Sequence, residues 1–289
     1  MTSDVKKILI VGAGCIGTQV AALCALRGFE TSVLDTVQSQ LSLSKDNIAA
    51  IFDNIIARKE ISQDMAAAAN SRLTFFDNME LAATNVDVVI ESVPESLDLK
   101  KEVFSDLNRY CKRETIFTTN TSDLPPSLIA PALQRPEQFA AFHFHAPLLG
   151  ADVVDIMPHP GTAPEVIILL RKLANDLEQT IIELNTERPG YLFNNMLNAL
   201  NRAALELAID NVAPPETIDK AWTKIMHTPI GPFGILDKVG LDTAHRIAQM
   251  GAEHFQDSAL WRIVDFLGGY VGRGHLGVKT GQGFYSYNS

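Results

Sequence analysis

Cysteine and positive charge are both in short supply in this sequence. Cys15, Cys24 and Cys111 are its three cysteines in 289 residues, too few and too far apart for a disulfide framework or a cysteine-ligated metal. We expect no bound metal, and we interpret Cys15 and Cys24 as small apolar fillers. The formal net charge of −10 argues against nucleic acid as a partner, because such a partner needs an extended basic surface.

Long apolar runs are missing as well. No stretch approaches the roughly 20 apolar residues that span a bilayer, so we expect no membrane partner. The first residues do not contain the apolar core of a secretion signal, and we expect a cytoplasmic location. What is present is the composition of a globular protein, with 46% apolar residues, and a length that suits two domains.

A glycine-rich turn near the N-terminus organises the rest of the chain. It follows an apolar run at residues 8–11, which predicts a strand buried on both faces of a parallel sheet. The spacing Gly12-x-Gly14-x-x-Gly17 then opens a predicted helix. In dinucleotide-binding folds the first glycine makes the turn, the second lets the pyrophosphate approach the backbone, and the third lets the helix pack on the strand.

The cofactor predicted by this turn is NAD. Cys15 and Ile16 begin the predicted helix, whose unpaired N–H groups would hold the phosphates. The next predicted strand, residues 31–34, ends at Asp35, where an acid can accept hydrogen bonds from the adenosine ribose hydroxyls. Residues 36–39 contain no Arg or Lys that could hold a 2′-phosphate, which favours NAD over NADP.

Predicted strands and helices alternate over the first two thirds of the chain. Between residues 39 and 69 apolar positions recur at helical spacing around a break at residues 58–62, which predicts a helical hairpin. The alternation is typical of an α/β Rossmann-type doubly wound sheet, here with the helix hairpin as an insertion. The predicted strands are residues 8–11, 31–34, 73–76, 86–93, 115–119, 139–144, 152–157 and 180–184.

The alternation stops near residues 185–189, and helical spacing follows. Glycines and a proline at residues 231–234 predict a turn within this part. We predict a Rossmann-like NAD-binding domain at residues 1–187 and an all-α C-terminal domain at residues 188–289. The predicted helices of the second domain are residues 191–208, 217–226, 241–251 and 259–269.

His143 is the leading candidate for a catalytic base. It ends an apolar strand segment, and a dehydrogenase needs a base for the hydroxyl proton while hydride leaves for the cofactor. His145 points to the same side of the predicted strand and is a rival. A histidine base also needs an orienting carboxylate, for which Asp155, on the next predicted strand, and Asp152 are the candidates.

Two polar residues are candidate hydrogen-bond donors to a substrate. Ser122 lies in a loop at the carboxyl end of a predicted strand, and Asn194 lies on the long helix that opens the second domain. On spacing alone, a turn role for Ser122 and an exposed helix face for Asn194 are the simpler interpretations.

Several stretches, taken in order, point to one family. The chain resembles the L-3-hydroxyacyl-CoA dehydrogenase family over essentially its whole length, and its middle part resembles the diketoreductase branch. The resemblance implies NAD-dependent oxidation of a short 3-hydroxyacyl-CoA such as 3-hydroxybutyryl-CoA, and a homodimer formed through the C-terminal helical domain. The matching stretches are VGAGCIGTQVA, VIESVPESLDLK, FTTNTSDLP, AAFHFHAPLLGADVVDIMPHP, ERPGYLFNNML, PIGPFGILDKVGLD and GHLGVKTGQGFYSY.

The resemblance implies roles for four candidate catalytic residues. The catalytic histidine of the family falls on His143, and its carboxylate partner, usually glutamate, falls on Asp155. The substrate-contacting serine falls on Ser122. The asparagine of a PGFIVNRLL-like stretch falls on Asn194.

Further matches complete the predicted cofactor site. Glu95 and Lys100 fall on family residues that lie near the nicotinamide ribose. Val93 and Asn120, at the carboxyl ends of two predicted strands, join them as predicted NAD-binding residues.

The chain departs from the family pattern at the acyl-carrier end. The family motif HFFNP has an asparagine where this chain has Ala146, which removes a donor. In the helical hairpin, where the family holds CoA partly through a serine and a lysine, the corresponding residues are Ile51 and Arg58, with Lys59 adjacent. A free 3-hydroxy acid or a (di)ketoester is therefore the alternative substrate for the same chemistry.

Two functions of other classes fit the sequence less well. A different β-hydroxyacid dehydrogenase would use a helical lysine as its acid, and residues 191–208 contain no lysine. A protein that binds NAD without turnover is the second, and the joint presence of His143, Ser122 and Asn194 argues against it.

Overall fold

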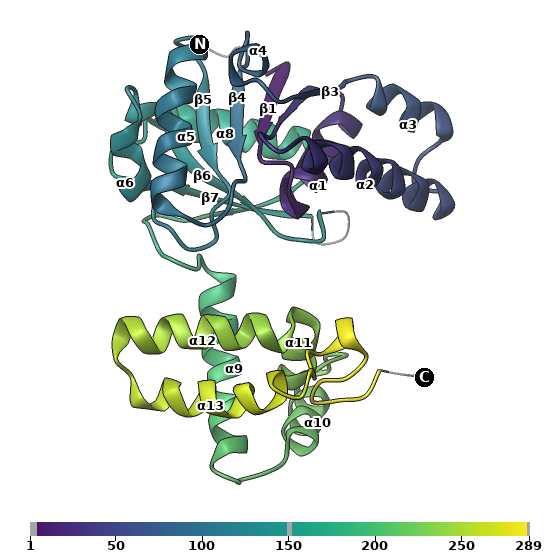
Figure 1. Cartoon of the computed structure of the whole chain (residues 1–289), viewed down its shortest axis with the longest axis vertical. Coiled ribbons are helices and arrows are strands. Elements are labelled where there is room, and N and C mark those ends of the chain that lie inside the picture. Colours follow the sequence, from purple (N-terminus) through teal and green to yellow (C-terminus); the bar gives the residue numbers. More distant parts are fainter. Residues whose placement is uncertain (1–4, 149–151, 288–289) are drawn as a thin grey trace. The chain divides into compact units, whose positions relative to one another are not determined.

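The computed structural model describes residues 5–148 and 152–287, which divide into two compact units (Figure 1). The units are Met1–Leu192 and Phe193–Ser289. The first unit extends past the predicted boundary at residue 187, so the segment that contains Tyr191 packs with the sheet of the first unit.

The first unit is built on one eight-stranded sheet, in the order β3-β2-β1-β4-β5-β6-β7-β8. Neighbouring strands are parallel except β6 and β7, which are antiparallel. This confirms the predicted Rossmann-type sheet. The strands are β1 (Lys7–Val11), β2 (Glu30–Leu34), β3 (Leu73–Phe76), β4 (Val88–Glu91), β5 (Ile116–Thr119), β6 (Phe139–Phe144), β7 (Val153–Pro158) and β8 (Thr180–Glu183).

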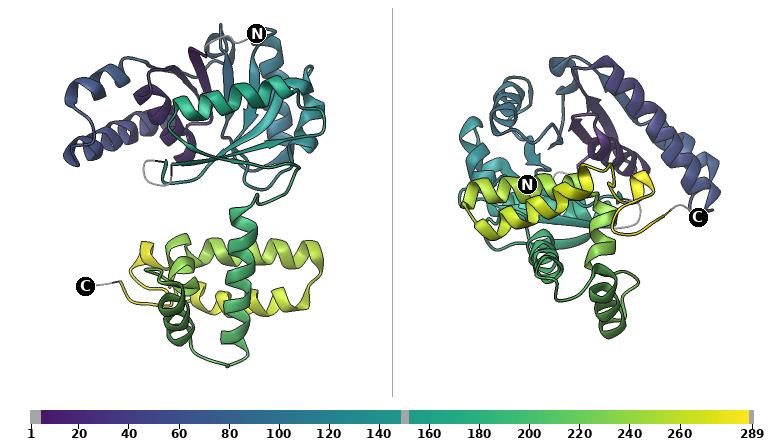
Figure 2. Two further views of the ribbon diagram at one scale, coloured as in Figure 1. Left: turned by 180° about the vertical axis from the view of Figure 1, so that it is seen from behind. Right: turned by 60° about the horizontal axis from the view of Figure 1, so that its bottom comes forward.

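Helices cover both faces of this sheet (Figure 1; Figure 2, left). Ile10 of β1 packs in the core that contains α1 (Cys15–Leu26) and α8 (Pro164–Asp176). Leu9 packs in the opposite core, with α5 (Leu97–Tyr110). Because successive side chains of a strand point to opposite faces, a strand covered on both sides has to be apolar at every position. This explains the unbroken apolar run that precedes the glycine turn.

The predicted helical hairpin is present as α2 (Gln38–Ala57) and α3 (Gln63–Asn70). Ser62 begins α3, because its side chain accepts a hydrogen bond from the N–H of Met65. Lys59 has a positive φ of 61° and turns the chain between the two helices. Short helices α4 (Met79–Ala82) and α6 (Pro126–Ile129) were not predicted, since four residues are too few to show a helical period.

The second unit is helical, as predicted. Its helices are α9 (Phe193–Ile209), α10 (Pro215–Met226), α11 (Pro232–Val239), α12 (Leu241–Phe255) and α13 (Ser258–Val271).

The predicted turn at residues 231–234 was wrong, because α11 begins there. Pro232 occupies the first turn, where its missing N–H costs nothing. The Asp219 carboxylate accepts the N–H groups of Phe233 and Gly234, which satisfies donors at the start of this helix.

The structure differs from the predictions at β4 and at Cys15. The predicted strand at residues 86–93 is shorter, since β4 ends at Glu91, whose own side chain accepts the N–H of Val93 and turns the chain. Cys24 is buried as expected, but Cys15 is exposed, so its interpretation as an apolar filler was wrong. Within the described ranges, none of the helices has both the length and the apolarity that crossing a bilayer requires.

Candidate active site

The glycine turn after β1 is shaped by two close approaches. A Cβ on Gly12, which has φ of +104°, would lie 2.6 Å from the carbonyl oxygen of Ser92. A Cβ on Gly17 would lie 2.0 Å from the carbonyl oxygen of Gly12. At Gly14, by contrast, no heavy atom of the described chain lies within 4 Å of where a Cβ would stand. The turn therefore leaves open space beside its middle glycine, as a bound pyrophosphate needs.

The start of α1 adds positive potential to this space. Gly14 precedes the helix and offers no side chain as a cap, and Cys15 and Ile16 form its first residues. The first turn of α1, all of which is described, carries no acidic side chain. Its N–H groups point out of the helix end and carry its positive dipole, which suits phosphate.

Asp35 lies beside the turn, directly after β2. Its Oδ2 accepts a hydrogen bond from the N–H of Ala13 at 2.9 Å, and its Oδ1 accepts one from the N–H of Val37 at 2.9 Å. These two bonds fix the carboxylate next to the glycine turn. Each oxygen keeps acceptor capacity for a ribose hydroxyl. The fit to NAD thus rests on a rigid turn, a helix end and an oriented acid.

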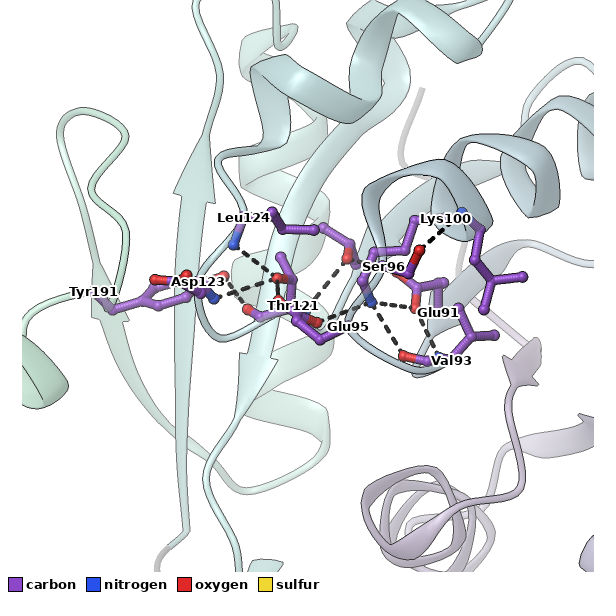
Figure 3. Close-up of polar contacts among 11 residues, drawn as sticks. Glu91, Val93, Glu95, Ser96, Lys100, Thr121, Asp123, Leu124 and Tyr191 are labelled. Carbon is purple, nitrogen blue, oxygen red and sulfur yellow. Dashed lines mark hydrogen bonds and ion pairs between the residues drawn. The ribbon is translucent and has the colours of Figure 1, made fainter. Parts of the chain in front are cut away.

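A partly buried network of polar contacts extends from β4 toward the next loops (Figure 3). Lys100 Nζ lies 2.7 Å from Glu91 Oε1, 3.3 Å from Glu95 Oε2 and 3.2 Å from the carbonyl oxygen of Val93. Burial raises the pKa of the Glu91 carboxyl above its ordinary value, although the charge of Lys100 opposes this. Lys100 is itself buried, so its ammonium group holds Val93 and Glu95 from the protein interior.

The loop after β5 joins this network to β6. Thr121 donates from its hydroxyl to the Glu95 carboxylate. Asn120 accepts the N–H of Phe144 on its Oδ1 at 2.7 Å, which ties the loop to the residue next to His143. Ser122 follows in the same loop and is exposed. The loop that contains Asn120 and Ser122 is therefore connected to Glu95 by a hydrogen bond within the first unit.

His143 and Asp155 form a cross-strand pair. The two residues lie directly opposite each other in the antiparallel pairing of β6 and β7. His143 Nδ1 lies 2.9 Å from Asp155 Oδ2, and the side chains are 8% and 1% exposed. With Nδ1–H donating to the carboxylate, Nε2 of the neutral ring carries the lone pair that a base requires.

His145 contacts the same carboxylate oxygen. Its Nε2 lies 2.7 Å from Asp155 Oδ2, and the His143 and His145 rings are 4.7 Å apart between centroids. Burial raises the pKa of Asp155, but the hydrogen bonds from His143 and His145 outweigh it and hold the pKa below its ordinary value.

Asp155, rather than Asp152, is therefore the partner of His143. Asp152 is exposed and accepts the N–H of Thr180 on its carbonyl oxygen.

Tyr191 was not singled out as a functional residue from the sequence. Its ring stacks on the His143 ring, with centroids 4.5 Å apart and planes 19° apart. Its hydroxyl donates to the carbonyl oxygen of Thr121 at 2.8 Å, as Figure 3 shows. Burial, and then the charge of Asp155, raises the pKa of Tyr191 well above its ordinary value, so the hydroxyl stays a donor. The available signal was a tyrosine where the family stretch PGFIVNRLL has phenylalanine.

Asn194 belongs to the second unit, on the first turn of α9, where it is half-buried. The structure therefore brings together His143, Asp155 and the Ser122 loop within the first unit, and describes Asn194 within the second. Glu91 was also missed, because an acid inside an apolar strand has no sequence pattern of its own.

The two halves of the chain match two family models. A model described as the NAD-binding domain of 3-hydroxyacyl-CoA dehydrogenase matches residues 7–187, and one described as the C-terminal domain of the same enzyme matches residues 190–287. The chain belongs to the 3-hydroxyacyl-CoA dehydrogenase family. It is thus an oxidoreductase whose cofactor is NAD.

Relatives in this family span the whole chain. The Bacillus subtilis protein named "Probable 3-hydroxybutyryl-CoA dehydrogenase" is 29% identical over 284 residues, which cover 98% of each chain. The 3-hydroxybutyryl-CoA dehydrogenase of Bradyrhizobium diazoefficiens is 29% identical over 290 residues, covering 99% of this chain and 97% of that one. A solved diketoreductase, described as acting on dicarbonyl compounds, is 33% identical with a TM-score of 0.93, over 99% of this chain and 100% of that one.

Proposed function

We propose that this member of the family interconverts an L-3-hydroxyacyl-CoA and the corresponding 3-ketoacyl-CoA, with His143 as the general base and acid. The observation that carries the proposal is the 2.9 Å contact between His143 Nδ1 and Asp155 Oδ2. It leaves Nε2 of His143 as the proton acceptor and places a negative charge where an imidazolium would form. A short acyl chain, as in 3-hydroxybutyryl-CoA, is the first substrate to test.

The chain's own groups would act as follows. Bound NAD⁺ supplies the acceptor for the hydride that leaves C3 of the substrate. His143 takes the hydroxyl proton on Nε2, and Asp155 stabilises the resulting imidazolium. In the reverse direction the imidazolium returns the proton. Ser122 is proposed as a donor to the substrate oxygen, and the same part for Asn194 stays a prediction from the family resemblance.

The proposed NAD site uses the groups already described. The backbone of Gly12, Gly14 and Gly17, together with the N–H groups of Cys15 and Ile16, would hold the pyrophosphate. Asp35 would accept the adenosine ribose hydroxyls. Glu95, with Val93 and Asn120 near it, would approach the nicotinamide ribose, and Lys100 would hold Glu95 in place.

A free 3-hydroxy acid or a (di)ketoester is the second candidate substrate. It is supported by the likeness to the diketoreductase, whose description names dicarbonyl compounds. In the helical hairpin, Ile51 is half-buried against the core, and Arg58 is exposed with its Nε 3.3 Å from Glu60. The hairpin therefore offers a cation but not the hydroxyl with which the family resemblance associates CoA.

A paired assay separates the two substrate classes. NADH production is measured with 3-hydroxybutyryl-CoA and with free 3-hydroxybutyrate, and NADH consumption is measured with a diketoester. We expect the highest kcat/KM with the CoA thioester. A kcat/KM at least as high for the diketoester would favour the second candidate. Absence of turnover with all three, while NAD still binds, would favour a binding protein instead.

We also propose that the second unit forms a homodimer. Its helices expose several large apolar side chains, and the family resemblance implies a homodimer formed through this domain. The exposed residues are Met196 and Leu207 of α9, Ile225 of α10, Met250 of α12 and Trp261 of α13. Sedimentation velocity at micromolar concentration should give about twice the 31.6 kDa of the chain; a monomer at that concentration would contradict the proposal.

A further inference from the structure

Asp155 Oδ2 is the acceptor of two histidines at once. His143 Nδ1 lies 2.9 Å from it and His145 Nε2 lies 2.7 Å from it. An ionised carboxylate can only accept, so both nitrogens must carry a proton and donate. The tautomers of the two rings are thereby set to opposite patterns, with the proton on Nδ1 in His143 and on Nε2 in His145.

The strand geometry explains how one oxygen reaches both rings. His143 and His145 are two residues apart along the chain, so they leave the backbone on the same face. His143 lies directly opposite Asp155 in the antiparallel pair, and His145 approaches on the diagonal. The N–H of His145 donates to the carbonyl oxygen of Val153, which keeps the backbone beyond β6 alongside β7.

The carboxylate of Asp155 can rotate about the Cβ–Cγ bond, and a second hydrogen-bond donor restrains this rotation. A single hydrogen bond from His143 leaves that rotation weakly restrained. Two donors to one oxygen, from rings that meet nearly edge to face at 68°, define the position of Oδ2 from two directions. An oxygen held in this way also fixes the plane of the His143 ring.

Polar groups from neighbouring elements surround the His143 ring. Asp155 faces His143 from β7, and Tyr191 stacks on the ring from the segment before α9. Glu91 and Glu95 act on Tyr191 from the neighbouring network, where Lys100 pairs with both. Asp155 thus contacts both histidine rings, and its negative charge lies where an imidazolium on His143 would need it.

We propose that His145 is a positioning residue for the reaction, which holds Asp155 Oδ2 against His143 and thereby sets the tautomer and the orientation of the His143 ring. The inference rests on the proposed function of His143. His145 acts on His143 through the Asp155 carboxylate, to which it donates from Nε2.

Two substitutions test this role. His145→Gln keeps an N–H donor near the position of Nε2, and His145→Phe removes the donor. His159→Gln is the matched control, because His159 is another buried histidine of the same unit, with Nε2 2.8 Å from the carbonyl oxygen of Pro136. All assays contain EDTA, since potential metal-binding atoms of His143, His145 and Asp155 lie within 4.8 Å of one another.

The first readout is kcat and KM, measured separately, for oxidation of the best substrate. His145→Gln should keep kcat within about threefold of the unmodified enzyme, because the donor to Asp155 is retained. His145→Phe should lower kcat by about 10- to 100-fold with little change in KM, because misplacing a catalytic group costs this much. A kcat in His145→Phe that matches the unmodified enzyme would overturn the proposal.

The second readout does not require turnover. Nitrogen NMR of ¹⁵N-histidine-labelled full-length protein reports which ring nitrogen carries the proton. We expect Nδ1–H for His143 in the unmodified protein and in His145→Gln, and a mixture of tautomers in His145→Phe. An unchanged His143 signal in His145→Phe would overturn the positioning role. If no substrate is turned over but the tautomers respond as expected, the proposed function fails and the positioning stands.

Discussion

Lys100 Nζ lies 2.7 Å from Glu91 Oε1 in the interior of the first unit, where the two side chains are 1% and 0% exposed. Glu91 Oε1 also accepts the N–H of Val93, and Oε2 accepts the hydroxyl of Thr119 at 2.7 Å. A buried ion pair with this many partners gains little net stability, because removing both charges from water offsets their attraction. Its consequence is positional: it fixes the turn between β4 and α5 that carries Glu95.

Replacement of Lys100 by methionine should therefore destabilise the protein strongly. The buried Glu91 carboxylate would lose its counter-charge, and the free energy of unfolding should fall by about 3–5 kcal/mol. Urea denaturation followed by circular dichroism measures this. Lys101→Met, on the same helix and half-exposed, is the control and should change the free energy of unfolding little.

A double variant tests the physical reason. Glu91→Gln combined with Lys100→Met removes both charges, so part of the lost stability should return. If the double variant is less stable than Lys100→Met alone, the unpaired charge is not the cause of the loss.

The sheet could be predicted because its signals are local. A strand buried on both faces is apolar at every position, and the glycine turn after Val11 has a spacing that few other structures need. The antiparallel pairing of β6 and β7 could not be predicted, since strand direction depends on how the chain returns between them. The start of α11 was missed for a related reason: Pro232 and Gly231 suggest a turn, and the Asp219 carboxylate that supports the helix comes from α10.

The sequence predicted which residues belong to the candidate site better than it predicted the contacts between them. His143 and Asp155 were proposed as partners because two adjacent strands could bring them together. That His145 shares the same oxygen required the strand register and the side-chain directions. The contact of Tyr191 with His143 could not be anticipated, because it joins two segments that are far apart in the chain. Long-range contacts of this kind depend on the completed sheet.

Replacement of His143 by glutamine should remove most of the activity and leave NAD in place. General acid–base catalysis typically contributes about 10²- to 10⁴-fold, and kcat should fall by that amount. Steady-state kinetics measures kcat, and calorimetric titration measures the NAD dissociation constant, which should stay within about twofold because His143 lies outside the glycine turn. His227→Gln, at an exposed position of the second unit, should behave like the unmodified enzyme. Full activity in His143→Gln would show that another group is the base.

Replacement of Asp35 by asparagine should weaken NAD binding. The carboxylate would lose charge-assisted hydrogen bonds to the ribose hydroxyls, which are worth about 1.5–3 kcal/mol, so the dissociation constant should rise about 10- to 100-fold. Calorimetry with NAD and with NADP measures both affinities. Asp77→Asn, at an exposed position after β3, is the matched control and should bind NAD normally. The unmodified protein should strongly prefer NAD; equal affinity for NADP would contradict the role of Asp35.

Asp87 should make stability depend on pH in a defined direction. Its Oδ2 accepts the N–H groups of Lys6 at 2.8 Å and Lys7 at 2.9 Å, and Lys112 pairs with its other oxygen. Burial raises the pKa of this carboxyl, but the hydrogen bonds, above all that from Lys112, outweigh it and hold the pKa below the ordinary value. The folded protein thus releases this proton more readily than the unfolded chain does. The stabilisation is complete above the unfolded pKa of about 3.9 and is lost as the pH falls through the lower folded value.

Asp87→Asn should therefore cost stability at neutral pH and progressively less in acid. We expect a loss of about 1–2 kcal/mol at pH 7, since the asparagine keeps an acceptor but loses the charge. Urea denaturation of both proteins between pH 3 and 8 gives the difference in free energy of unfolding, which should be constant above about pH 5 and shrink below it. Asp77→Asn, exposed in the same unit, should show a small difference at every pH. A difference that grows as the pH falls would mean that the folded state raises the pKa of Asp87, contrary to the contacts that hold its charge.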